Sequence, residues 1–236
     1  MPPSLVVTGG SSGIGAACAR LYLARGWRVA AISRRGEAPA GATAIAADLS
    51  QEAGVNAAAG AVAGWLGSGS GGGAAGLDAL IHAAGDFLVR PIADTAPAEF
   101  ERIWRITVWA KFALTRALLP LLRAGADTAP PKVIVLVASL AAHQDFPQET
   151  AYMSAMHAVV GLARAQDAEL RPLRIRAAVL SPGLVRTALT ERSFAPPVLA
   201  TALEPDAMAS SAAYLIDTIR AGGYIPEIFH VPQNSR

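Results

Sequence analysis

Short apolar runs alternate along the chain with longer segments in which apolar residues recur every three or four positions. The short runs predict strands at Leu5–Val7, Arg28–Ile32, Ala42–Ala46, Leu77–His82, Val133–Ala138, Ile175–Leu180 and Ile225–Val231. The longer segments predict helices at Gly13–Arg25, Gln51–Trp65, Ala98–Ala124, Ala151–Leu170 and Asp206–Arg220. Strands that are apolar almost throughout are typical of a parallel sheet covered by helices on both faces. The pattern therefore predicts an α/β fold, a doubly wound parallel sheet of about seven strands joined by right-handed crossovers.

The length and composition favour one compact domain, which we expect to span residues 1–236. Hydrophobic residues make up 53% of the chain and charged residues 16%, and this balance indicates a large buried core. The glycine- and serine-rich run Gly67–Gly73 is expected to be an exposed, flexible linker. It is not a predicted domain boundary, because a boundary there would divide the sheet.

Charge, hydropathy and cysteine content narrow the class of partner. The formal net charge is +2, and no basic run with interleaved aromatic residues suggests a nucleic-acid site. The longest apolar run, Val133–Ala142, is far shorter than the ~20 residues that a membrane span requires. The single cysteine, Cys18, cannot form an internal disulfide, and no secretory signal precedes the first strand. We therefore expect a cytoplasmic protein that acts on a small molecule and has no metal site.

A glycine-rich turn follows the first predicted strand and opens the first predicted helix. Such a turn lets the backbone approach a pyrophosphate, and the first turn of a helix offers the anion unpaired N–H groups. The strict dinucleotide fingerprint is only partly met, because Cys18 stands where glycine or alanine is expected. The spacing Thr-Gly-x-x-x-Gly-Ile-Gly nevertheless resembles the short-chain dehydrogenase/reductase family. The turn residues predicted to bind the cofactor are Gly9, Ser11, Ser12, Gly13, Ile14 and Gly15.

Further signatures of that family follow at the ends of later strands, where ligands of doubly wound sheets bind. Asp48-Leu49 matches the pair that contacts adenine, and Ala83-Ala84-Gly85 lies at the family's Asn-Asn-Ala-Gly motif without either asparagine. The resemblance implies that a turn near residues 182–187 holds the nicotinamide and pyrophosphate, through Pro182, Gly183, Val185 and Thr187. We expect His82, just before the second of these motifs, to satisfy backbone groups at its strand end.

Ser139 and Tyr152, thirteen residues apart, resemble the family's catalytic pair. In that family the tyrosine passes a proton to or from the reacting carbonyl oxygen while the serine positions that oxygen. The chemistry requires such a pair, because hydride delivered to a carbonyl carbon leaves an alkoxide that needs a nearby O–H donor.

Arg34 and Arg35 follow the second predicted strand, and no acidic residue comes before Glu37. A guanidinium there suits a 2′-phosphate, whereas a carboxylate suits an unphosphorylated ribose. These arginines therefore favour NADP(H), with NADPH preferred and NAD the alternative.

Two family positions carry other residues. Met156 stands four residues after Tyr152, where the family has a lysine that lies beside the phenol and binds the ribose hydroxyls. His157 lies about 100° further around the helix and cannot replace that lysine. Thr107 stands where an active-site asparagine holds a proton-relay water. A phenol with an unshifted pKa near 10 is only about 0.1% ionised at pH 7, which favours carbonyl reduction over alcohol oxidation.

Three functions remain open at this point. The first is an NADP(H)-dependent reductase of a small or polyketide-like carbonyl compound. The second is a non-redox enzyme that performs a cyclisation, dehydration or isomerisation, for which His143 and Asp145 would supply acid–base chemistry in a substrate pocket that also contains Leu184. The third is a catalytically impaired cofactor-binding protein. The resemblance also implies a homodimer or homotetramer paired through the helices Ala98–Ala124 and Ala151–Leu170.

Overall fold

Seven parallel strands form one sheet in the computed structural model, which describes residues 1–68, 76–127, 130–223, 225 and 228–232. Within these residues the strand order is β3-β2-β1-β4-β5-β6-β7. The strands are β1 (Ser4–Thr8), β2 (Arg28–Ser33), β3 (Thr43–Ala46), β4 (Ala79–His82), β5 (Lys132–Val137), β6 (Ile175–Pro182) and β7 (Ile228–Val231). The predicted doubly wound sheet is confirmed. The predicted linker falls largely on residues 69–75, outside the described residues.

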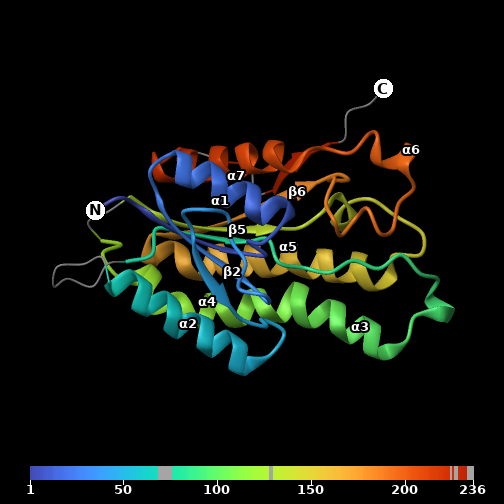
Figure 1. The fold of residues 1–236 in the computed structure, drawn as a ribbon, viewed down its shortest axis with the longest axis horizontal. Coiled ribbons are helices and arrows are strands. Elements are labelled where there is room, and N and C mark those ends of the chain that lie inside the picture. The colour runs from blue at the N-terminus through green and yellow to red at the C-terminus, as the bar shows by residue number, and fades with distance from the viewer. Residues whose placement is uncertain (69–75, 128–129, 224, 226–227, 233–236) are drawn as a thin grey trace.

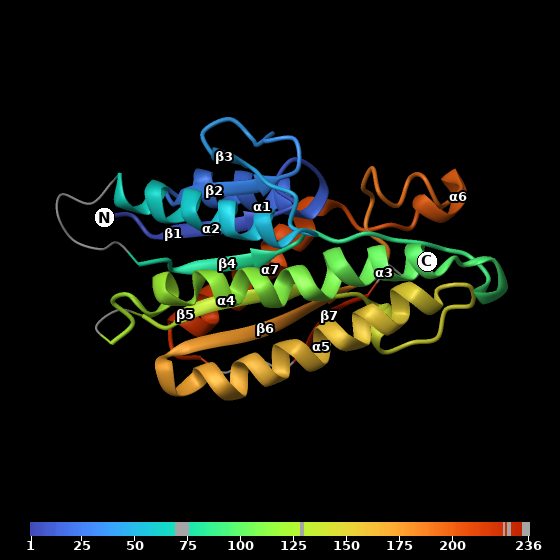
Figure 2. The same ribbon diagram turned by 90° about the horizontal axis from the view of Figure 1, so that it is seen from below.

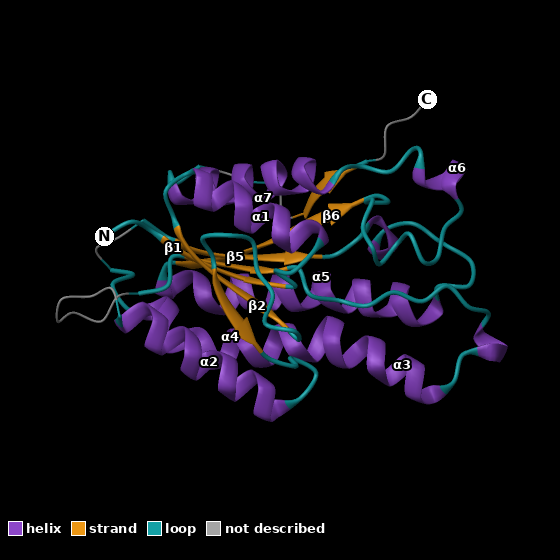
Figure 3. Cartoon of the chain, in the orientation of Figure 1, coloured by secondary structure: helices purple, strands orange, loops and turns teal. Residues whose placement is uncertain are grey.

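Helices cover both faces of the sheet (Figures 1 and 3). One face packs on α1 (Gly13–Ala24) and α7 (Pro205–Arg220), and the other on α2 (Glu52–Gly67), α4 (Ala110–Arg123) and α5 (Thr150–Leu170). Successive side chains of a strand point to opposite faces, so each strand contributes to both cores. In β1, Leu5 and Val7 pack toward α1 and α7, whereas Val6 packs toward α2, α4 and α5.

The predicted helix Ala98–Ala124 is confirmed, with one irregular turn inside it. It consists of α3 (Pro97–Trp104), a π-helical turn η2 (Arg105–Trp109) and then α4. Apolar periodicity continues through a single widened turn, because Val108 packs both against the cluster of Ile103, Ala151 and Ala155 and against the larger core of α4. Figure 2 shows α3 and α4 running in one line beneath the sheet. The wide turn contains Thr107, so the irregularity lies at a family site position.

The carboxyl ends of the strands point toward the end of the molecule where α3 and α6 (Pro196–Leu199) lie (Figures 1 and 2). The chain moves outward from β1 in one direction through β2 and β3, and in the other through β4 to β7. Ligands of such sheets bind at this reversal. Three single 3₁₀ turns complete the elements, η1 (Ile92–Asp94), η3 (Leu140–Ala142) and η4 (Arg171–Leu173). Among the described residues, no helix has the length and apolarity to cross a membrane.

Candidate active site

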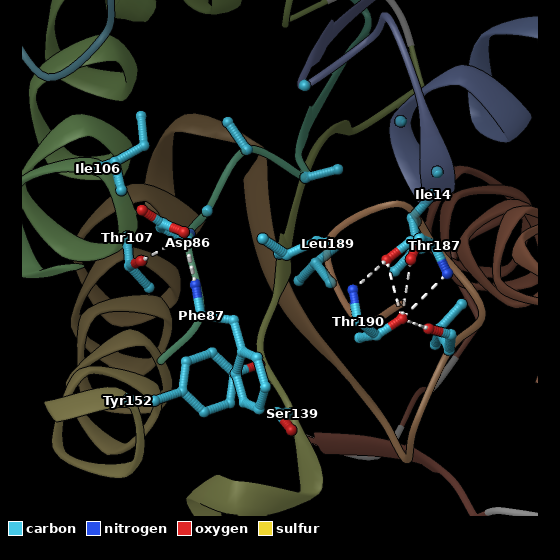
Figure 4. Close-up of a pocket in the computed structure, with 18 of the residues that line it drawn as sticks. Ile14, Asp86, Phe87, Ile106, Thr107, Ser139, Tyr152, Thr187, Leu189 and Thr190 are labelled. Atoms are coloured by element: carbon cyan, nitrogen blue, oxygen red, sulfur yellow. Dashed lines mark hydrogen bonds between the residues drawn. The ribbon is translucent and has the colours of Figure 1, made fainter. Parts of the chain in front are cut away.

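A cleft of about 1300 Å³ runs along the carboxyl ends of the strands. It is lined by residues from across the sequence, and Figure 4 shows Asp86 and Thr107 on one side with Ile14 and Thr187 on the other. The structure brings together here Gly9, Ser11, Ser12, Gly13, Ile14, Gly15, Arg34, Arg35, Asp48, Leu49, Ala83, Ala84, Gly85, Thr107, Ser139, Tyr152, Met156, Pro182, Gly183, Leu184, Val185 and Thr187.

The glycine turn forms one end of the cleft because side chains would not fit there. Gly9 has φ +68°, and a Cβ on it would lie 3.0 Å from the Ala84 backbone nitrogen. A Cβ on Gly15 would lie 2.4 Å from the Gly9 carbonyl oxygen, so α1 begins directly against the turn. Ser12 precedes α1 in an extended conformation and makes no side-chain capping bond. The first N–H groups of α1 are therefore left for an anion such as a pyrophosphate.

The turn after β6 packs against this helix start. A Cβ on Gly13 would meet the Thr187 methyl carbon at 3.0 Å. The Thr187 N–H donates to Thr190 Oγ1 at 3.0 Å, and the Thr190 hydroxyl donates to the Val185 carbonyl at 2.6 Å (Figure 4). These bonds hold the threonine beside the first turn of α1.

The two arginines after β2 differ in their partners. Arg35 pairs with Glu37 at 2.7 Å, while Ser33 accepts from the Glu37 N–H at 3.0 Å and closes the turn. Arg34 is exposed, and among the described residues it has no carboxylate partner. On the next strand end, Asp48 accepts from the Ser50 N–H at 3.0 Å and hydroxyl at 2.7 Å. Arg34 is therefore the guanidinium available to a phosphate at this end of the cleft.

Ser139 and Tyr152 meet on the opposite wall of the cleft (Figure 4). Ser139 follows β5 and accepts from the Ala141 N–H at 3.2 Å, which fixes the serine side chain at the start of η3. Tyr152 lies in the first turn of α5 and lines the cleft together with Ser139. Burial raises the pKa of Tyr152 to about 12; the Ser139 side chain lowers that pKa and the nearby Glu149 carboxylate raises it. The expectation of an unshifted phenol pKa is therefore wrong, because burial penalises the phenolate.

Aromatic rings border this pair. Phe87, from the loop after β4, stands edge-on to Tyr152 with ring centroids 4.7 Å apart. Phe194, from the segment after β6, lies 5.6 Å from Phe87. The two phenylalanines therefore connect the loop after β4 with the segment after β6 and place aromatic surface beside the phenol.

Thr107 and Met156 are buried residues of the cleft wall. Thr107 is fully buried, and its hydroxyl accepts from the Asp86 N–H at 3.5 Å (Figure 4). Asp86 in turn pairs with Arg102. Met156 is packed among the apolar residues of α4 and α5, whereas His157 is exposed and donates to the Met153 carbonyl. His157 does not line the cleft, so it offers no replacement for a lysine at position 156.

Two buried ionisable residues of the cleft are absent from the sequence prediction. Lys111 of α4 is 2% exposed, and burial lowers its pKa to about 7. Glu149, just before α5, is 7% exposed, and burial raises its pKa to about 7. Lys111 could have been found from the sequence, because it continues the buried stripe formed by Leu114, Leu118 and Leu122 on α4.

The sequence is similar to those of known proteins. Residues 4–197 match the model of the short chain dehydrogenase family. The chain belongs to the short-chain dehydrogenase family. It is 30% identical over 208 residues to 1-deoxy-11-beta-hydroxypentalenate dehydrogenase of Streptomyces avermitilis, covering 83% of this chain and 73% of that one. It is 31% identical over 202 residues to 2-(R)-hydroxypropyl-CoM dehydrogenase of Xanthobacter autotrophicus, covering 79% and 76%.

Solved structures of the short-chain dehydrogenase fold superpose along nearly the whole chain. A 3-ketoacyl-(acyl-carrier-protein) reductase from Brucella melitensis complexed with NADH has a TM-score of 0.85 at 27% identity, covering 98% of this chain and 96% of that one. ElxO with NADP bound has a TM-score of 0.81 at 18% identity and covers 98% of each chain, which shows the fold alone. The short-chain dehydrogenase family binds nicotinamide cofactors, and the cleft at the carboxyl ends of the strands is the place where this chain would hold one.

Three predicted positions of this short-chain dehydrogenase differ from expectation. His143 and Asp145 are exposed and lie outside the cleft lining. The His143 ring contacts Ser181 at 3.3 Å and packs edge-on against His230, with ring centroids 4.6 Å apart. His82 bonds the Thr115 hydroxyl at 2.9 Å, so its partner is a side chain of α4 and not a strand-end backbone group. The direction that a loop takes after a strand depends on tertiary packing, which the pattern of apolar and polar residues does not predict.

Proposed function

We propose that this short-chain dehydrogenase is an NADP(H)-dependent oxidoreductase that reduces a carbonyl group of a small or polyketide-like metabolite. The observation that carries the proposal is that Ser139 and Tyr152 line the same wall of the cleft that begins at the glycine turn. Relatives named as dehydrogenases of small metabolites support the reaction class. The 3-ketoacyl reductase among the structural neighbours supports the direction of the reaction.

The residues that would hold the cofactor fit its shape and charge. The N–H groups at the start of α1 suit the pyrophosphate, and Gly9 and Gly15 let the turn pack closely against the Ala84 backbone and the helix start. Arg34 suits a 2′-phosphate on the adenosine ribose, and Thr187 lies beside the pyrophosphate position. When bound, the reduced nicotinamide supplies the hydride that adds to the carbonyl carbon.

Tyr152 and Ser139 complete the reaction at the carbonyl oxygen. The Ser139 hydroxyl donates to that oxygen and orients it, and Tyr152 gives its phenolic proton as negative charge develops there. With the phenol pKa raised to about 12, Tyr152 is protonated in all but about one molecule in 10⁵ at pH 7. It is thus a ready proton donor and a poor base, which favours reduction over alcohol oxidation.

Two substitutions distinguish the proposed active site from the family pattern. Met156 takes the place of the lysine and Thr107 that of the asparagine, and neither a thioether nor a methyl-bearing hydroxyl reproduces the missing group. The Thr107 hydroxyl bonds the Asp86 N–H and so supports the loop after β4. The positive charge is not replaced from α5, because position 156 is apolar and buried.

The proposal is tested by following the absorbance of NADPH with a panel of ketones, aldehydes and 3-ketoacyl thioesters. We expect turnover with at least one carbonyl class, and a loss of about 10²-fold or more in kcat for Tyr152→Phe at unchanged NADPH affinity. Substrate conversion without NADPH consumption would instead support the non-redox reading. Cofactor binding without turnover on the panel would support the impaired, cofactor-binding reading.

A further inference from the structure

We propose that Lys111 of α4 binds the nicotinamide ribose of the cofactor and supplies the positive charge that Met156 of α5 cannot supply. The inference rests on the proposed function insofar as it takes the cleft to bind a nicotinamide dinucleotide. It adds a residue that stands at neither of the family positions compared above. The active-site cation would thus have moved from one helix to its neighbour.

The chain contains two lysine residues, and both are buried. Of the 20 Lys and Arg residues only Lys111 and Lys132 are lysines. Lys132 is 3% exposed and pairs with Asp78 at 2.9 Å, at the opposite end of the strands from the cleft. Lys111 lines the cleft, and among the described residues it has no carboxylate partner. The buried ammonium of Lys132 is thus explained by the fold, whereas that of Lys111 is not.

The position of the Lys111 amine points to the cofactor. Its Nζ donates to the Ala84 carbonyl at 2.7 Å, and an ammonium has two further protons to donate. The Ala84 N–H donates to Thr8 Oγ1 at 3.0 Å, and the same residue packs against Gly9 of the glycine turn. Lys111 is therefore fixed to the loop that joins the pyrophosphate end of the cleft to the end containing Phe87 and Tyr152. A dinucleotide with its pyrophosphate at the glycine turn and its nicotinamide ring at Tyr152 would have its nicotinamide ribose in this interval.

Burying an unpaired ammonium is costly unless a ligand compensates for it. Burial lowers the pKa of Lys111 to about 7, and the pKa of His82 lies well below its ordinary value through burial and the Lys111 charge. His82 is therefore neutral and adds no compensation. Ribose hydroxyls accept hydrogen bonds from an ammonium, and the adjacent phosphates stabilise its charge. A dinucleotide in the cleft supplies both.

The helix geometry explains why α4 can take this role. Thr107 and Lys111 lie four residues apart, on the same helical face, and both bond the loop after β4, at Asp86 and Ala84 respectively. The π-helical turn η2 immediately precedes α4, and such turns are frequent at functional sites. On the facing helix α5, Met156 fills its place with a buried apolar side chain and supplies no charge.

A purely structural lysine that only braces the loop through Ala84 is the alternative, and lysine-selective NMR separates the two. In protein labelled with ¹³Cε-lysine the two lysines give two resonances, assigned by the loss of one in Lys111→Met. We expect saturation with NADP⁺ to shift the Lys111 resonance and raise its pKa by at least one pH unit, while the Lys132 resonance stays fixed as an internal control. Binding confirmed by calorimetry with neither resonance moving would overturn the proposal. Absence of calorimetric binding would instead remove the proposed function.

A second experiment moves the positive charge from position 111 on α4 to position 156 on α5. We expect Lys111→Met to weaken NADPH binding by about 10-fold and to lower kcat by about 10²-fold. In the Lys111→Met background, Met156→Lys should restore at least a tenth of the lost activity, and in the wild-type background it should give no gain. A double variant as inactive as Lys111→Met, with unchanged circular dichroism, would show that the charge is not what Lys111 contributes.

Discussion

Lys111→Met is expected to stabilise the fold while it damages the site. Methionine has nearly the length of lysine and matches the apolar surroundings on α4, so the substitution removes a buried charge without leaving a large cavity. The folded pKa of about 7 compares with 10.5 for the free amine. At about 1.4 kcal/mol for each pH unit, keeping the amine charged in the folded protein costs about 5 kcal/mol.

Part of that gain is offset by the lost hydrogen bond. Without the amine, the Ala84 carbonyl loses its 2.7 Å donor, at a cost of about 1–3 kcal/mol. We therefore expect the variant to be more stable than the wild type by about 2–4 kcal/mol at pH 6, which corresponds to a rise in Tm of about 5–15 °C.

The pH dependence of the stability difference between Lys111→Met and the wild type tests the sign of the buried-charge penalty separately. The folded pKa of Lys111 is depressed, so the penalty is fully present below about pH 7 and disappears as pH rises from about 7 to 10.5. Urea unfolding followed by tryptophan fluorescence at pH 6 and pH 10 measures the difference directly. A variant that is less stable than the wild type at pH 6, or a difference that does not change with pH, would refute the reasoning about the buried charge.

Three other outcomes are expected. Arg34→Ala should weaken NADPH binding by about 10-fold or more and leave NADH binding unchanged. The matched variant Arg35→Ala should have a smaller effect, because the Arg35 side chain is held by Glu37. Calorimetry with both nucleotides measures these affinities. Glu149→Gln should gain up to about 3 kcal/mol of stability relative to the wild type as pH rises from about 4.5 to 7, because burial raises the carboxyl pKa to about 7 and the buried anion destabilises the wild type. A difference in urea midpoint between variant and wild type that is the same at pH 5 and pH 8 would contradict this expectation. We further propose a homodimer or homotetramer through α4 and α5, where Phe112 is half exposed; light scattering that gives the monomer mass at micromolar concentration would exclude it.

The sheet and most of the cleft could be predicted from the sequence because their signals are local. Strands β1 and β5 are apolar on both faces, and the glycines of the turn after β1 stand at positions where a Cβ would meet backbone. The strand ends then meet at one edge of a parallel sheet by topology alone. Tyr152 and Ser139, separated along the chain, come together for that reason.

The remaining features depend on packing that a pattern does not record. Lys111 sits next to Phe112 in sequence, yet only the fold shows that the lysine is buried and the phenylalanine is half exposed. The widened turn η2 preserves the apolar periodicity that predicted one continuous helix. The raised pKa of Tyr152 requires knowledge of its burial and of Glu149 beside it. His143 turns toward His230 because of how β6 and β7 end, which the loop sequence does not reveal.

The central claim is that a nicotinamide dinucleotide lies in the cleft with its reactive ring at Tyr152. A crystal structure of the protein with NADP⁺ tests it most directly. We expect the pyrophosphate at the Gly9–Gly15 turn, the nicotinamide ring beside the Tyr152 hydroxyl, and the ribose within hydrogen-bonding distance of Lys111. A cleft without nucleotide at millimolar NADP⁺, or a nicotinamide ring directed away from Tyr152, would contradict the account.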